Sequence, residues 1–228
     1  MMDHISAIRN SVNSSDLWSM QWFEKSPEYR HWIASQRANL SFFSRGSTGK
    51  SMIISRLALK NPHHSIVIDM PFLEKDRSQT QEREEDEEIS TDINAAMKKP
   101  KADDLRILQS LVYQLIALDP QKADILATVL KDKILQPKGS FDDVSYLRSA
   151  LLQLLPEPQG SDCLYLFVDG INQTSRDISL PFINLILSAH FRNSRLRVLF
   201  SGCPIDYLCS VLADVPTISL ETERQRML

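Results

Sequence analysis

The sequence predicts an α/β fold in which helices cover both faces of a mostly parallel sheet. Short apolar runs rich in β-branched residues alternate with longer stretches of helical periodicity, a pattern typical of strands joined by crossover helices. The chain has 228 residues, enough for one large domain with a sizeable core. Ligands of parallel sheets bind beyond the carboxyl ends of the strands, so the residues that follow each apolar run are the first candidates for a site.

Apolar runs mark the expected strands, and helical periodicity marks the segments between them. The clearest helix begins at an N-cap of Asp103 or Asp104 and ends before Pro120, with its leucines on one face. The expected strands lie at residues 40–44, 65–70, 163–170, 196–202 and 216–220. The expected helices lie within residues 51–60, 103–120, 121–133, 142–155 and 180–191.

Residues 1–38 are expected to form a helical segment that packs on the core. Trp18 and Trp22 are four residues apart and therefore fit one face of a helix. A single helix through this region is disfavoured because Pro27 lacks a backbone donor, so we expect one short helix before Pro27 and another that starts at it. The aromatic residues of both helices are interpreted as core residues.

Residues 39–228 form the second expected unit, which is interrupted by a segment of different composition at residues 74–102. This segment contains "EREEDEEIS" and then "KKPKA", and it has very few large apolar residues. Such a segment cannot bury enough apolar surface to offset the entropy lost on ordering. We therefore expect a disordered insertion there.

The stretch "FFSRGSTGKS" at residues 42–51 has the features of a phosphate-binding loop. Glycines in such a loop let backbone N–H groups turn toward the phosphates, the lysine reaches the β- and γ-phosphates, and the following hydroxyl binds Mg²⁺. A strand before the loop and a helix after it supply the context that this motif requires. The fold prediction therefore narrows to a P-loop NTPase three-layer sandwich with an N-terminal helical extension.

Ser44 occupies the position at which such a loop usually opens with glycine. Serine narrows the permitted backbone angles of that turn but removes no phosphate ligand. The alternative interpretation is a strand-to-helix turn that contains Gly-Lys-Ser by chance. The residues expected to contact a nucleotide are Ser44, Arg45, Gly46, Ser47, Thr48, Gly49, Lys50, Ser51 and Met52.

A second strand tip carries an acid, because "CLYLFVDG" ends in Asp169 and a glycine. P-loop NTPases use an acid at the end of another strand to help hold Mg²⁺. We therefore expect Ser51 and Asp169 to be the magnesium ligands, with Asp169 as a simple turn former as the alternative.

Four stretches, in this order, resemble the NACHT-like NTPase domains of fungal STAND proteins, including their nephrocystin-like N-terminal type. They are "SPEYRHWIASQRANLSFFSRGSTGKS", "DLRILQSLVYQLI", "CLYLFVDGINQTS" and "RLRVLFSGCP", and the resemblance covers roughly residues 15–220. The resemblance implies a P-loop fold that binds ATP or ADP with Mg²⁺. Proteins of that class continue into a winged-helix segment and a repeat array, and we expect neither within these residues.

The chain departs from the pattern of that family at three positions. The family carries two acids where this chain has Asn172 and Gln173, and an arginine where this chain has Cys203. The resemblance implies that the acids handle the attacking water and that the arginine senses the γ-phosphate. These departures imply that the binding chemistry is partly kept and the hydrolytic chemistry is weakened or lost.

Three classes of function fit the sequence. The leading hypothesis is a nucleotide-binding regulatory or interaction module with weakened or lost hydrolysis. An active NTPase or phosphotransferase is the second, and it would need a replacement acid such as Asp69, which ends the run "SIVIDM". The third is a protein-interaction module that has lost its nucleotide altogether.

Composition and charge disfavour several other classes. The net charge is −3 and the pI about 6.0, so we expect neither nucleic acid nor membrane as a partner. Apart from a nucleotide, the expected partner is another protein or a second copy of the chain. No secretory signal or long apolar run is visible, and the three cysteines show no metal spacing, which together favour a cytoplasmic protein with reduced thiols.

Overall fold

In the computed structural model, the described strands form one parallel sheet, which confirms the predicted α/β class. The sheet has the strand order β2-β3-β4-β1-β5, and every neighbouring pair is parallel. The strands are β1 (Ala38–Phe43), β2 (Ser65–Asp69), β3 (Leu164–Asp169), β4 (Leu196–Gly202) and β5 (Thr217–Ser219). The structure describes residues 16–35, 38–45, 49–70, 92–134, 144–155, 163–192 and 195–219.

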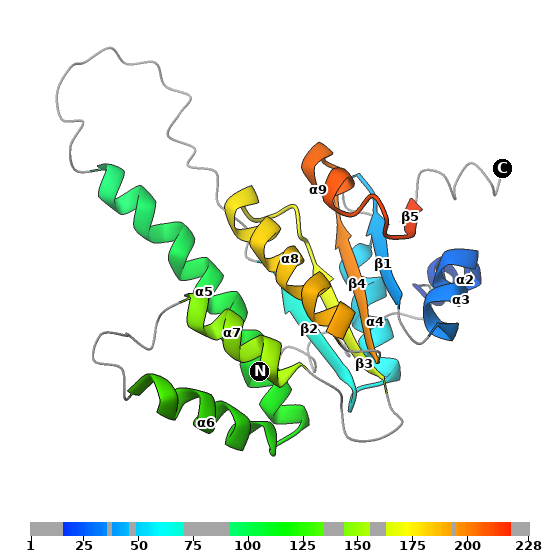
Figure 1. Cartoon of the computed structure of the whole chain (residues 1–228). Coiled ribbons are helices and arrows are strands. Elements are labelled where there is room, and N and C mark those ends of the chain that lie inside the picture. The colour runs from blue at the N-terminus through cyan, green and yellow to red at the C-terminus, as the bar shows by residue number, and fades with distance from the viewer. Residues whose placement is uncertain are drawn as a thin grey trace, which may run out of the picture.

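Helices lie on both faces of the sheet, which makes the fold a three-layer α/β sandwich. One face is covered by α5, α7 and α8, and the other by α4 together with α2 and α3 (Figure 1). Their bounds are α2 (Asp16–Lys25), α3 (Pro27–Ala34), α4 (Lys50–Lys60), α5 (Asp92–Leu118), α6 (Lys122–Ile134), α7 (Val144–Leu154), α8 (Arg176–Arg192) and α9 (Asp206–Val211). No helix in these described segments is long and apolar enough to cross a bilayer.

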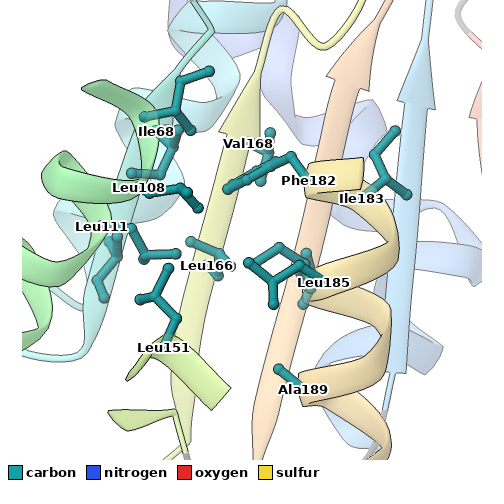
Figure 2. Packing of buried hydrophobic residues seen from close by; sticks show 14 of the residues in the cluster. Ile68, Leu108, Leu111, Leu151, Leu166, Val168, Phe182, Ile183, Leu185 and Ala189 are labelled. Carbon is teal, nitrogen blue, oxygen red and sulfur yellow. The ribbon is translucent and has the colours of Figure 1, made fainter. Parts of the chain in front are cut away.

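The central strands are buried on both sides, which explains why they read as continuous apolar runs. Along β3, Leu166 and Val168 belong to the core beneath α5, α7 and α8, whereas Phe167 belongs to the core beneath α3 and α4. This alternation follows from the two-residue period of a strand. Figure 2 shows the first of these cores, where Leu108 and Phe182 reach the sheet from different helices.

The N-terminal helical extension is divided at Pro27, as the sequence predicts. The Ser26 hydroxyl caps α3 by accepting a 3.2 Å hydrogen bond from the Tyr29 backbone N–H, and Pro27 occupies the first turn. Trp32 is 1% exposed, and its Nε1–H donates to the Val198 carbonyl at 3.1 Å. The extension is therefore joined to the middle of the sheet by both packing and a buried hydrogen bond.

The long helix α5 begins at Asp92, well before the expected start near Asp103 or Asp104. Residues 92–102, which we expected to belong to a disordered insertion, are helical; the rest of that segment, residues 74–91, lies outside the described residues. Their sequence "DINAAMKKPKA" has three alanines and three lysines, residue types that favour helix, and it also contains Pro100, which disfavours one.

Asp104 is therefore not an N-cap but an interior residue of α5. It is 7% exposed, and its Oδ2 accepts a 2.6 Å hydrogen bond from Arg148 Nη2 of α7. Burial raises the pKa of the Asp104 carboxyl, and the Arg148 guanidinium opposes this shift. The acid at this position thus joins two helices and does not start one.

Candidate functional site

The entry to the glycine-containing loop is anchored to the neighbouring strand β4. β1 ends at Phe43, and Ser44 is fully buried beyond it. The Ser44 backbone N–H donates to the Gly202 carbonyl at 3.1 Å, which continues the β1–β4 ladder by one bond. Gly46, Ser47 and Thr48 lie outside the described residues.

At the exit of the loop the backbone is left-handed, a conformation that favours glycine. Gly49 is the N-cap of α4 and has φ 77°, a left-handed conformation that other residues rarely adopt. As a glycine, Gly49 has no side chain with which to cap the first backbone amides of α4. A helix N-terminus with this geometry attracts anions through its amides and its dipole.

Lys50 lies at the first turn of α4, and its side chain contacts the backbone beyond the end of β1. Its Nζ donates to the Ser44 carbonyl at 2.9 Å, so the ammonium group lies near the point where the chain leaves β1. Ser51 is exposed in the same turn, Met52 is half-buried, and Arg45 is exposed at the loop entry. Lys50 and the α4 N-terminus therefore concentrate positive potential at the carboxyl end of β1.

Asp169 ends β3 at the same edge of the sheet. It is 7% exposed, and its Oδ1 accepts a short hydrogen bond from the Ser201 hydroxyl of β4. β4 lies between β1 and β3, which places the two tips two strand spacings apart, or roughly 10 Å. The sheet thus brings the acid and the loop lysine to one edge, as the sequence pattern predicts for parallel strands.

Asn172 and Cys203, two of the positions expected to depart from the NACHT-like pattern, contact each other. The Asn172 side-chain oxygen accepts a 2.8 Å hydrogen bond from the Cys203 backbone N–H. Gly202 lies beside this bond, and a Cβ on it would come within 2.9 Å of Asn172 Oδ1. An alanine at this position would force the side chains of Asn172 and Ile171 to shift.

Gln173 and Asp69 do not lie at the tip of β3, where Asp169 is. Gln173 is exposed, and its backbone N–H donates to the Gly170 carbonyl at 2.7 Å in the turn after β3. Asp69 is exposed at the tip of β2, where it is the register partner of Asp169. Since β2 is the edge strand beyond β3, Asp69 is farther from the loop than Asp169.

The donor set of this edge suits a hard cation. Mg²⁺ prefers oxygen ligands, usually one or two protein groups that act together with substrate phosphates. The Asp169 carboxylate and the Ser51 hydroxyl are oxygen groups of this kind, whereas the described residues contain no group of three or more His, Cys, Asp or Glu suited to a metal on its own. A magnesium ion held jointly with a nucleotide therefore fits better than an all-protein metal site.

The sequence pattern did not single out Ser201 or Gly202 of β4. The one available signal was the change from apolar residues to "SG" at the end of the run "LRVLFSG". Their contacts reach both the loop entry and the turn after β3, and these contacts depend on the strand order of the sheet.

A solved structure of a DNA replication initiation factor is similar in shape to this chain. The match has a TM-score of 0.39 and 8% identity, and it covers 96% of this chain and 51% of the other. This chain thus spans about half the length of that protein. No curated protein sequence matches the chain.

A family model matches most of the chain. It is the model described as nephrocystin 3, N-terminal, and it matches residues 19–202. The match begins in α2 and ends at Gly202, so it includes the loop, the Asp169 tip and β4. The chain belongs to the nephrocystin 3 N-terminal family.

Proposed function

We propose that this domain binds a purine nucleotide, ATP or ADP, together with Mg²⁺, hydrolyses it weakly or not at all, and acts as a regulatory or interaction module of the STAND class. The observation that carries the proposal is the Asn172–Cys203 hydrogen bond. It lies at the carboxyl edge of the sheet, whose other groups suit a nucleotide. The groups that would bind phosphate are present, whereas the position that would handle water holds an amide with an engaged oxygen.

Phosphate binding would rest on the backbone and on Lys50. Gly49 has a left-handed backbone at the N-terminus of α4, and as a glycine it has no side chain that would occupy the first amides of this helix. Lys50 Nζ already lies at the loop entry, where it donates to the Ser44 carbonyl. A β- or γ-phosphate oxygen would offer this ammonium a charged acceptor, which makes a stronger hydrogen bond than a carbonyl does.

Magnesium would be held between the nucleotide and the protein by Asp169 and Ser51. The ion would neutralise negative charge on the β- and γ-phosphates. Asp169 is held in place by Ser201, and Ser51 is exposed in the first turn of α4. Both protein ligands thus belong to elements that the sheet orients toward the same edge.

Hydrolysis would lack a proton acceptor at the usual place. A carboxamide does not accept a proton as a carboxylate does, and the Asn172 oxygen is already bonded to the Cys203 N–H. The Gln173 side chain is also an amide. Losing a proton-handling or charge-stabilising group typically lowers a rate by about 10²–10⁴-fold. The backbone loop and lysine that hold the phosphates do not depend on that group.

The test is a phosphate-release assay with saturating Mg-ATP on the wild type, Lys50→Ala and Lys60→Ala. Lys60 is the matched control, because it lies in the last turn of α4 and pairs with Glu24 at 2.5 Å, away from the loop. We expect all three proteins to release phosphate at the background rate. Turnover by the wild type and Lys60→Ala that Lys50→Ala abolishes would show that hydrolysis is retained.

An active phosphotransferase is the second candidate, and the position of Asp69 favours it. Asp69 is exposed and lies in register with Asp169, so two carboxylates sit at neighbouring strand tips. If Asp69 replaces the family acids, Asp69→Asn must remove any Lys50-dependent turnover. Turnover that persists in Asp69→Asn excludes this role for Asp69.

A further inference from the structure

The last residues of β4 hold together the two halves of the candidate site. The Gly202 carbonyl accepts from the Ser44 N–H at 3.1 Å, and the Ser201 carbonyl accepts from the Ile171 N–H at 2.9 Å. β4 is therefore bonded through its backbone to the loop entry on one side and to the turn after β3 on the other. A side chain at this tip can influence both.

Ser201 contributes the side-chain contact within this arrangement. It is fully buried, and its hydroxyl donates to Asp169 Oδ1. The Gly170 backbone N–H approaches the same hydroxyl at 3.4 Å as a donor. Because a serine hydroxyl has one proton, an approach by the Gly170 N–H favours directing that proton to the carboxylate.

The hydrogen bond from Ser201 makes the two oxygens of Asp169 unequal. Oδ1 is occupied by Ser201, whereas no described residue forms a hydrogen bond with Oδ2. Outer partners that bond to a ligating carboxylate fix its orientation and its basicity. The free oxygen of Asp169 is thus the one available to a cation at this edge.

We propose that Ser201 is a positioning residue that fixes the Asp169 carboxylate so that Oδ2 faces the magnesium of a bound nucleotide. This inference rests on the proposed nucleotide binding. It adds that the contribution of magnesium to nucleotide affinity depends on Ser201. Ser201 would not touch the nucleotide itself, so its loss would weaken the metal-dependent part of binding and leave the phosphate contacts of the loop unchanged.

The test compares nucleotide affinity with and without the metal in four proteins: the wild type, Ser201→Ala, Ser201→Thr and Ser41→Ala. The affinity for ATP is measured by calorimetry in Mg²⁺ and again in EDTA, and the readout is the ratio of the two dissociation constants. Ser41 is the matched control, because it is a fully buried serine of the same sheet whose hydroxyl bonds to Thr217 at 2.5 Å.

Magnesium enhancement is the factor by which ATP affinity in Mg²⁺ exceeds ATP affinity in EDTA. Ser201→Ala is expected to lower this factor by about 10–100-fold, or to abolish it where the wild-type factor is smaller than that. The affinity in EDTA should be unchanged. Ser201→Thr keeps the hydroxyl and should retain most of the enhancement, and Ser41→Ala should retain all of it. An unchanged ratio in Ser201→Ala, or an equal fall in Ser41→Ala, overturns the role of Ser201 while leaving nucleotide binding intact. A wild type that binds ATP in neither condition overturns the proposed function itself, and the inference with it.

Discussion

The side-chain oxygen of Asn172 accepts a 2.8 Å hydrogen bond from the backbone N–H of Cys203. The two residues belong to different loops, one after β3 and one after β4, and they are 31 positions apart in the chain. Both are positions at which the sequence analysis expects a departure from the NACHT-like pattern. The two residues form one contact that joins two strand tips.

Removing the Asn172 side chain should destabilise the fold modestly. We expect Asn172→Ala to lower the free energy of unfolding by about 1 kcal/mol, because the Cys203 N–H loses its partner. Asn172→Asp keeps an acceptor at the same place and is the matched control. Urea unfolding at neutral pH measures both; equal stability of wild type and Asn172→Ala would mean that the bond contributes nothing.

Gly202 should tolerate alanine better once Asn172 is shortened. A Cβ on Gly202 would lie 2.9 Å from Asn172 Oδ1 and 3.1 Å from Ile171 Cγ1. We expect Gly202→Ala to cost about 1–3 kcal/mol in the wild type and clearly less in the Asn172→Ala background. A double-mutant cycle of unfolding free energies measures this coupling, and strict additivity would contradict the close approach.

Trp32 of the N-terminal helix α3 should contribute strongly to the stability of the fold. The side chain is 1% exposed, packs on Phe167 and Tyr165, and donates to the Val198 carbonyl. We expect Trp32→Ala to cost about 3–5 kcal/mol. Tyr113→Ala, at a side chain that is 61% exposed, should change stability by less than about 0.5 kcal/mol. Similar unfolding midpoints for both variants would show that the N-terminal helices do not pack as described.

Stability should fall at alkaline pH through Tyr29. Burial first, and the nearby Glu24 carboxylate second, raise the pKa of Tyr29 from 10.0 to about 12. Since the unfolded chain releases this proton at a lower pH than the folded chain, the free energy of unfolding falls as the pH rises from about 10 to about 12. Tyr29→Phe should show a smaller fall over that range.

The control for the alkaline experiment is Tyr113→Phe, which removes an exposed phenol. Urea unfolding of the three proteins at several values between pH 9 and pH 12 gives the slopes. The Tyr113→Phe slope should match that of the wild type. A Tyr29→Phe slope equal to the wild-type slope would contradict the raised pKa.

The parallel sheet and the order of its strands along the chain could be read from the sequence, because strands buried on both faces appear as continuous apolar runs. The run "LYLFVD" is such a case, and its acid lies at the strand tip. The start of α5 at Asp92 could not be read, because this part of the helix is poor in apolar residues and lacks the periodicity on which helix prediction depends.

The residues proposed for the site were identifiable by type, but their partners were not. Lys50 and Asp169 stand out because loop and strand-tip positions require particular chemistry. The contacts of Ser201 with Asp169 and of Asn172 with Cys203 depend on β4 lying beside β3. That strand order arises from the packing of the whole domain, and no local sequence pattern encodes it.

Calorimetric titration of the full chain with ATP in Mg²⁺, beside Lys50→Ala, tests nucleotide binding most directly. We predict saturable binding by the wild type at or below millimolar ATP, and a loss of at least about tenfold in affinity for Lys50→Ala, because a charge-assisted contact to phosphate is removed. Absence of saturable heat for a folded wild type, or equal affinity for both proteins, would contradict nucleotide binding at this loop.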